Sequence, residues 1–157
     1  MHLTRSTTIE APADLIWSLV SDLPAMGSLS PENVGGEWRR GATGPVVGAR
    51  FRGHNRKGWR RWSTNVLVTK CEPAQSFAIA VSSFGIPVAE WAYEISKDAS
   101  GSCTVAESWA DRRPSWFKRP ASLVTGGGYT DTADVAANLD STLAALKQTA
   151  ERQAVTN

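Results

Sequence analysis

Five stretches of this sequence alternate in a way that predicts β-strands with an unusual inner face. In the first, Phe51, Gly53 and Asn55 alternate with charged or polar residues. Successive side chains of a strand point to opposite faces of the sheet, so each alternating set lies on one face. The other four sets are Trp62, Thr64, Val66 and Val68; Phe77, Ile79 and Val81; Ala89, Trp91, Tyr93 and Ile95; and Cys103, Val105, Glu107 and Trp109.

These inner faces mix large aromatic residues with polar ones, among them Asn55, Thr64 and Glu107. A dry core rejects polar groups that have no partner. A ligand cavity, by contrast, has mostly apolar walls and a few placed polar groups. The pattern therefore predicts a sheet that encloses space for a small molecule.

The segments before these strands predict one more strand and one or two short helices. Residues 2–9 have the pattern of a first strand, and Pro12 is expected at the first position of a helix that runs to about Asp22. A loop or second short helix over residues 26–31 and a short strand at 37–39 follow. The connections between the later strands, at 55–58, 72–75, 82–87 and 98–101, are short. Connections of that length favour hairpins and antiparallel pairing.

A long amphipathic helix is predicted near the C-terminal end. One apolar stripe lies along a predicted helix of about six turns, and residues after Arg152 are expected to fray. The stripe consists of Val135, Leu139, Leu143, Leu146 and Ala150, and the opposite face of Asp134, Asn138, Ser141, Lys147 and Glu151. An antiparallel sheet with an apolar face needs a cover. A helix laid across a curved sheet leaves a gap, and that gap is the predicted cavity.

Length and composition favour a single globular domain over residues 1–157. Hydrophobic residues make up 41% and charged residues 20%, and the net charge of +2 gives no indication of nucleic acid as a partner. Cys71 and Cys103 are expected to be reduced structural thiols. The first residues lack the apolar core of a signal peptide, and no apolar run approaches the roughly 20 residues of a membrane span. We therefore expect a cytoplasmic protein.

Several segments resemble a known superfamily. They are Ile9–Trp17, Asp22-Leu23-Pro24, Ser30-Pro31-Glu32, Gly48–Asn55, Trp62-Ser63-Thr64, Trp91–Glu94, Glu107-Ser108-Trp109 and the closing helix. Together they resemble the START-like (SRPBCC) superfamily and, within it, actinobacterial proteins labelled polyketide cyclase/dehydrase. The resemblance implies an α+β helix-grip fold, in which a curved seven-stranded antiparallel sheet wraps around a long C-terminal helix. It also implies a hydrophobic ligand such as a lipid, polyketide, sterol or hormone, but no particular activity, because only some members are enzymes.

Glu107 is the strongest single candidate for chemistry. Burial against aromatic walls raises the pKa of a carboxyl group, and such a group can donate a proton or bind a ligand carbonyl. The alternative is a carboxylate that pairs with an arginine near the cavity rim. Asn55 and Tyr93 are secondary polar candidates. Asn55 alternatively shapes the following turn, and Tyr93 is alternatively a core aromatic.

The predicted ligand-binding residues include aromatic residues that fit plain core packing equally well. The full set is Trp38, Phe51, Asn55, Trp62, Phe77, Trp91, Tyr93, Glu107, Trp109, Trp116, Phe117 and Leu139. Trp116 and Phe117 lie in a proline-bounded loop, residues 112–120, that precedes the last helix. This loop is a candidate hydrophobic gate, a candidate site of transient contact with an anionic membrane, or simply a solvated loop.

Other kinds of site are not predicted. The run Gly126–Gly128 lacks the Lys-Ser/Thr that completes a P-loop, which favours a hinge. His2 and His54 are the only histidines and have no ligand-like spacing, so neither a metal nor another cofactor is expected.

Three functions fit the sequence. The first is a binding or carrier protein for a hydrophobic small molecule. The second is a polyketide cyclase or dehydratase that uses Glu107 as acid or base. The third is a regulatory module that binds a protein partner. The sequence favours binding over catalysis, because Glu107 is the one titratable group expected to face inward and acid–base sites usually have two.

Overall fold

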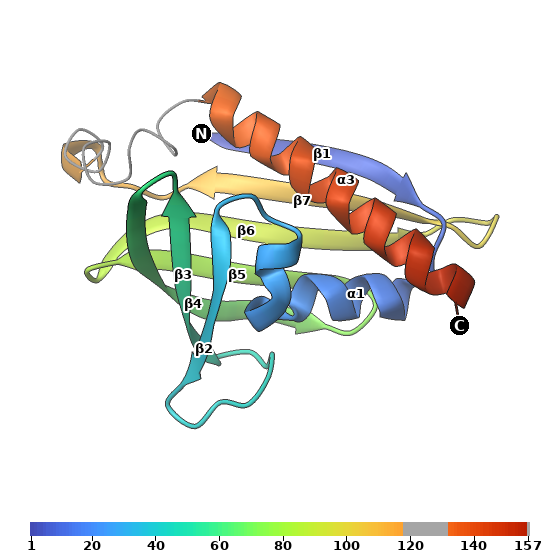
Figure 1. The fold of residues 1–157 in the computed structure, drawn as a ribbon, viewed down its shortest axis with the longest axis horizontal. Helices are drawn as coiled ribbons and strands as arrows, with labels where there is room; N and C mark the ends of the chain where they lie inside the picture. The colour runs from blue at the N-terminus through green and yellow to red at the C-terminus, as the bar shows by residue number, and fades with distance from the viewer. Residues whose placement is uncertain (118–131, 157) are drawn as a thin grey trace.

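The computed structural model describes residues 1–117 and 132–156. In chain order the elements are β1 (His2–Ile9), α1 (Ala13–Ser21), the 3₁₀ helix η1 (Leu23–Ser28), β2 (Asn33–Arg39), β3 (Arg50–Lys57), β4 (Arg60–Glu72), β5 (Ser76–Ser83), β6 (Ile86–Lys97), β7 (Cys103–Asp111), the 3₁₀ helix η2 (Ser115–Phe117) and α3 (Thr132–Thr156). The strands form one antiparallel seven-stranded sheet in the order β1-β7-β6-β5-β4-β3-β2 (Figure 1). The predicted α+β helix-grip fold is confirmed.

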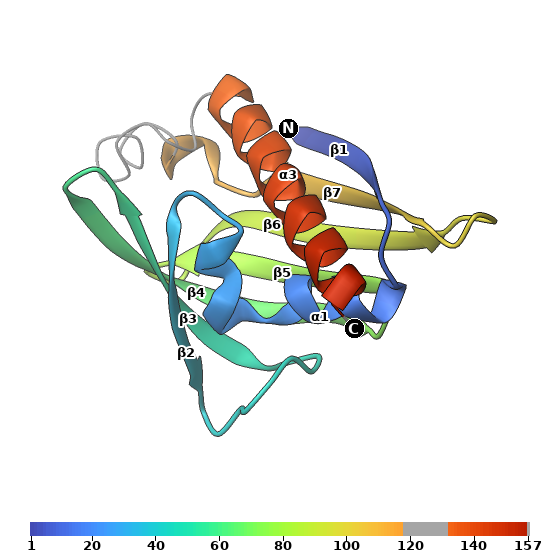
Figure 2. The same cartoon turned by 45° about the vertical axis from the view of Figure 1, so that its right-hand side comes forward.

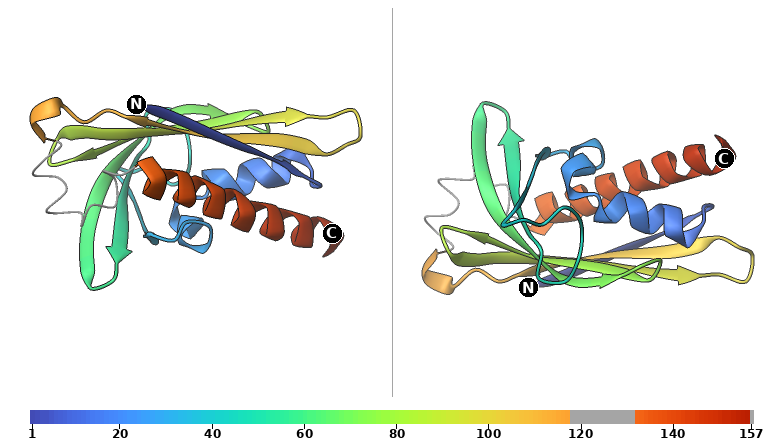
Figure 3. Two further views of the ribbon diagram at one scale, coloured as in Figure 1. Left: turned by 90° about the horizontal axis from the view of Figure 1, so that it is seen from above. Right: turned by 90° about the horizontal axis from the view of Figure 1, so that it is seen from below.

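The sheet bends strongly around the helical layer. Seen from above and from below, the β3–β4 hairpin turns away from the plane of β1, β7 and β6, toward the side on which α3 lies (Figure 3). Register shifts interrupt the pairing between Val68 and Lys70 and between Val81 and Ser82. Bulges of this kind bend a strand and increase its twist. The bend turns the inner face of the sheet toward α3, and α1 and η1 lie on the same side of the sheet as α3 (Figure 2).

Helix α3 covers the sheet with the predicted apolar stripe. All five stripe residues are at most 3% exposed. Leu143, Leu146 and Ala150 belong to the main core, whereas Val135 and Leu139 form a second cluster with Ala89 and Trp109. No helix in the described ranges is long and apolar enough to cross a membrane.

The start of α1 and the end of α3 differ slightly from the predicted positions. Pro12 is the N-cap of α1 rather than its first helical residue, because it has an extended backbone and its carbonyl accepts the first helical hydrogen bond from the amide of Ile16. Helix α3 continues past Arg152 to Thr156, whose hydroxyl donates to the carbonyl of Arg152, and fraying of this last turn stays a prediction.

Two hairpin turns are tighter than predicted. Strands β3 and β4 remain paired up to Lys57 and Arg60, and β5 and β6 up to Ser83 and Ile86. Asn55 therefore does not shape a turn. It lies within β3, opposite Trp62 on β4, with its side chain on the inner face.

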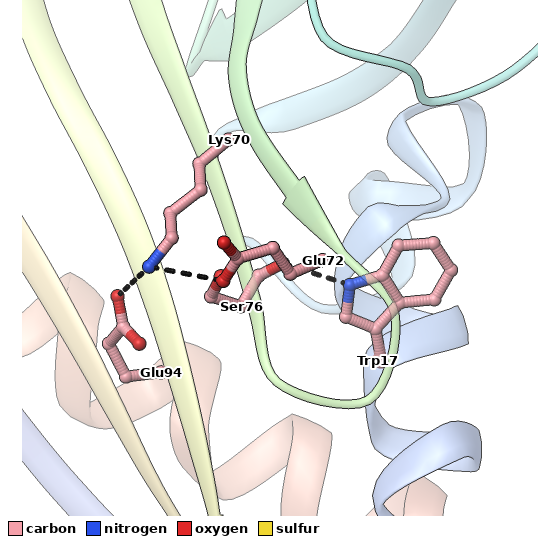
Figure 4. A network of polar contacts seen from close by, with 5 residues as sticks. All are labelled: Trp17, Lys70, Glu72, Ser76 and Glu94. Carbon is pink, nitrogen blue, oxygen red and sulfur yellow. Dashed lines mark hydrogen bonds and ion pairs between the residues drawn. The ribbon is translucent and has the colours of Figure 1, made fainter.

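A polar network ties α1 to the hairpin between β4 and β5 (Figure 4). The indole nitrogen of Trp17 donates to the carbonyl of Ser76 at 3.0 Å, and the hydroxyl of Ser76 donates to Glu72 at 2.7 Å. Lys70 contacts Glu72 and Glu94 from the exposed side. Exposed ion pairs of this kind contribute little to stability, so the partly buried hydrogen bond from Trp17 is the main link.

Candidate functional site

A cavity of about 240 Å³ lies between the inner face of the sheet, η1 and α3. Its wall is mainly apolar and aromatic, and includes Phe51, Trp62, Phe77, Ile79, Val81 and Trp91. Phe84, at the turn between β5 and β6, also lines it and is 89% exposed. The cavity therefore reaches the surface at that turn.

Seven of the predicted ligand-binding residues line this cavity, namely Phe51, Asn55, Trp62, Phe77, Trp91, Tyr93 and Glu107. Five strands, β3 to β7, bring them together because each points its alternate residues inward, as the sequence pattern predicted. Their contact with a ligand stays a prediction.

Four other predicted ligand-binding residues do not line the cavity. Trp38 packs edge-on against Phe51, with ring centroids 5.2 Å apart. Trp109 and Leu139 fill the buried cluster between β7 and α3. Trp116 is 68% exposed on η2. The side chain of the remaining candidate, Phe117, lies outside the described part of the chain.

Glu107 is the most buried charged residue of the cavity wall, at 1% exposure. Tyr93 lies directly opposite it on β6, and the Tyr93 hydroxyl donates to Oε1 of Glu107 at 2.7 Å. Oε2 of Glu107 has no hydrogen-bond partner. Burial raises the pKa of Glu107 to about 7, an effect that the hydrogen bond from Tyr93 only partly opposes. Near neutral pH this group can therefore accept or donate a hydrogen bond.

The pKa of Tyr93 is raised well above its usual value, first by burial and then by the charge of Glu107. The tyrosine therefore stays protonated and acts as the donor of the pair. The alternative in which Glu107 pairs with an arginine is wrong, because its partner is Tyr93 and the cavity arginine, Arg113, binds Asp111.

Arg113 is a cavity residue that sequence reasoning missed. Its Nε and one terminal nitrogen donate to the two carboxylate oxygens of Asp111 at 2.9 and 3.1 Å, and both side chains are only 5% exposed. The backbone amide of Arg113 donates to the same carboxylate. The guanidinium thus lies at the cavity wall with its charge neutralised by a bidentate partner.

Glu32 was also missed. It precedes β2, is 6% exposed and lines the cavity. Its Oε1 lies 3.6 Å from Nζ of Lys57, whereas its Oε2 has no hydrogen-bond partner. Lys57 in turn lies 3.8 Å from Asp134 on α3. The backbone carbonyl of Glu32 accepts from the amide of Arg56, which fixes this segment beside β3.

Helix α3 contributes two polar groups to the cavity, and one of them, Asn138, belongs to the face that the sequence pattern set opposite the apolar stripe. Asn138 and Thr142 line the cavity, four residues apart and hence on one side of the helix. From the sheet, Asn55 adds an amide that donates to the hydroxyl of Thr64 at 3.3 Å. Among residues 1–117 and 132–156, no group of three or more His, Cys, Asp or Glu side chains comes together in a way that could hold a metal ion.

A bent antiparallel sheet that grips a C-terminal helix over an internal cavity, with a few buried polar groups in an apolar wall, defines the helix-grip class of ligand-binding domains. The chain belongs to the family described as polyketide cyclase / dehydrase and lipid transport, whose sequence model matches residues 1–151.

Solved structures share this fold. A Polyketide_cyc-like protein from Corynebacterium glutamicum is 26% identical, with 97% of this chain and 92% of that chain covered and a TM-score of 0.63. StfQ, a di-domain ARO/CYC of the steffimycin biosynthetic pathway, is 15% identical, with 96% of this chain and 45% of the StfQ chain covered and a TM-score of 0.69. Major latex-like protein 151 from Panax ginseng is 13% identical, with 96% of this chain and 97% of that chain covered, and also has a TM-score of 0.69. A search of curated proteins gave no match.

Proposed function

We propose that this protein binds a hydrophobic or amphipathic small molecule in the cavity and releases it unchanged, as a carrier or binding protein. The observation that carries the proposal is the free Oε2 of Glu107, 1% exposed and set in an apolar wall. Buried polar atoms are normally paired, so an unpaired oxygen in a cavity indicates a place for a ligand group. The family description, which includes lipid transport, supports this proposal.

The size of the cavity limits what it can enclose. A volume of about 240 Å³ lies just below the roughly 300–1,000 Å³ of typical small-molecule sites, which favours a compact guest such as a compound of a few rings or a short acyl chain. A longer lipid would extend past Phe84, where the cavity reaches the surface.

Filling the cavity should abolish binding, and Thr142→Phe tests this. The new ring would project from α3 into the cavity. Ser141→Phe is the matched control, because it places the same ring on the exposed face one residue earlier. We expect organic extraction and mass spectrometry to recover a bound compound from the wild type and from Ser141→Phe, but less than about a tenth as much from Thr142→Phe. No bound compound in the wild type, or equal amounts in all three proteins, would contradict the proposal.

An enzymatic role is the second candidate, and the pKa of Glu107, about 7, favours it. A carboxyl group with such a pKa is suited to proton transfer at neutral pH. The catalytic alternative is a cyclase or dehydratase acting on a polyketide-like compound. The same extraction separates the two roles, because a carrier returns an added compound with its mass and structure unchanged.

If the guest is a membrane lipid, we expect the described part of the 112–120 loop to contact the bilayer. Element η2 and the β5–β6 turn lie at the same end of the molecule (Figures 1 and 3), and they carry the exposed Trp116 and Phe84. We expect the wild type to float with anionic liposomes and Trp116→Ala to float at least about threefold less, since aromatic side chains anchor at membrane interfaces. Absence of the wild type from the floating fraction would remove membrane contact from the proposal.

A further inference from the structure

The cavity wall contains two acidic side chains, and each has one oxygen without a partner. Glu32 approaches from the segment before β2 and Glu107 from the middle of β7. They are 6% and 1% exposed, and neither Glu32 Oε2 nor Glu107 Oε2 has a hydrogen-bond partner. A buried carboxylate oxygen without a donor is costly, so two of them in one cavity require an explanation.

The nearby cations do not supply the missing donors. Arg113 is the basic residue among the described residues of the wall, and it binds both oxygens of Asp111. Lys57 is 42% exposed and lies 3.6 Å from Oε1 of Glu32, not from the free Oε2, while it also approaches Asp134. The ion pair with Lys57 therefore accounts for Oε1 of Glu32, but it does not provide a partner for Oε2.

We propose that Glu32 is a second polar anchor of the cavity, and that Glu32 and Glu107 together select an uncharged or cationic guest that carries hydroxyl or amino groups and reject guests that carry a carboxylate. The inference rests on the proposed function, because it concerns the guest of the same cavity. A hydroxyl or amino group would donate to the free oxygens in charge-assisted hydrogen bonds. A carboxylate would meet two acids and no uncommitted cation in the described wall, and the repulsion between like charges would disfavour its binding.

Three probes with one ring system test this selection: a dihydroxynaphthalene, naphthylmethylamine and naphthoic acid. Each is small enough for the cavity, and they differ mainly in the polar group. Calorimetric titration is done at a pH about one unit above the pKa of Glu107, about 7, so that this carboxyl group is largely ionised. We expect the diol and the amine to bind the wild type at least about tenfold more tightly than naphthoic acid.

Glu32→Gln isolates the new anchor, because glutamine keeps the shape of the side chain and removes its charge. We expect the variant to bind the amine about tenfold more weakly and to bind naphthoic acid more tightly than the wild type does. Glu37→Gln is the matched control. It removes a carboxylate that is 56% exposed on β2, paired with Arg39, and should leave all three affinities unchanged.

The outcomes separate this inference from the proposed function. Equal affinity of the wild type for all three probes, or unchanged affinities in Glu32→Gln, would overturn the selection and leave cavity binding intact. Failure of every probe to bind the wild type would count against the proposed function itself, and the inference would fall with it. If Glu32→Gln does not fold, Glu107→Gln gives the second comparison and should also lose affinity for the amine.

Discussion

The free energy of unfolding should fall by about 3 kcal/mol as the pH rises from 4.5 to about 7, because of Glu107 alone. Burial raises the pKa of this group from 4.5 to about 7 in the folded protein. The folded state therefore holds the proton more tightly than the unfolded chain does. The stability that protonated Glu107 contributes is fully present below the pKa that this group has in the unfolded chain. It is lost as the pH rises through the pKa that the group has in the folded protein. Above that, both states are ionised and the loss is constant.

Glu107→Gln separates this effect from that of the other acids. The amide oxygen of glutamine still accepts the hydrogen bond from Tyr93, but the side chain never ionises. We expect the variant to match the wild type within about 1 kcal/mol near the unfolded pKa, and to be more stable by about 2–3 kcal/mol about one pH unit above the folded pKa. Urea unfolding monitored by tryptophan fluorescence at both pH values measures the difference.

A carboxylate on the neighbouring strand gives the control. Glu94 lies on β6 with its side chain 56% exposed near Lys70, and Glu94→Gln should shift stability by less than about 1 kcal/mol at either pH. A constant offset between Glu107→Gln and the wild type across the whole range would show that Glu107 has an ordinary pKa and is hydrated in the folded state.

The pairing of Tyr93 with Glu107 illustrates what the sequence predicts well. Both residues occupy inward positions of an alternating pattern, and two adjacent antiparallel strands place them directly opposite one another. Because strand periodicity is fixed at two, the inward face follows from the sequence once the strands are recognised. The sheet, its hairpins and the strand-borne part of the cavity wall were predictable for that reason.

The periodicity of a strand predicts which face of the sheet a residue lies on. It does not predict whether other side chains pack against that residue or leave a cavity beside it. Trp109 shares the inner face of β7 with Glu107, yet it packs against Leu139 and Val135, whereas Glu107 borders the cavity. The difference depends on where α3 crosses the bent sheet. The same crossing turns Asn138 toward the cavity, although a simple helical stripe assigns it to solvent.

Glu32 and Arg113 were missed for another reason. Both lie outside regular repeats, one between η1 and β2 and the other just after β7. Their positions depend on the path of those connections, which no periodic pattern describes. In the case of Arg113 one local signal existed: Asp111, two residues earlier at the end of a strand, is within reach of a bidentate pair.

Removing the partner of Arg113 should be among the most destabilising conservative changes in the protein. Asp111→Asn keeps the size of the side chain but leaves a guanidinium, 5% exposed at the cavity wall, without its carboxylate. Loss of one member of a buried ion pair typically costs about 3–5 kcal/mol, because the remaining charge stays buried and uncompensated. We expect a loss of this size in urea unfolding. The double variant Asp111→Asn, Arg113→Met should recover most of it, since the buried charge is then gone.

The adjacent exposed ion pair is the matched control for this prediction. Arg112 donates to Glu90 at 2.7 Å, but its side chain is 54% exposed and that of Glu90 is 46% exposed. Water competes for both charges, so Glu90→Gln should cost less than about 1 kcal/mol. If Asp111→Asn costs no more than Glu90→Gln, the Arg113 guanidinium is hydrated rather than buried. It would then be an available cation at the cavity wall, and the expected rejection of carboxylate-bearing guests would lose its electrostatic basis.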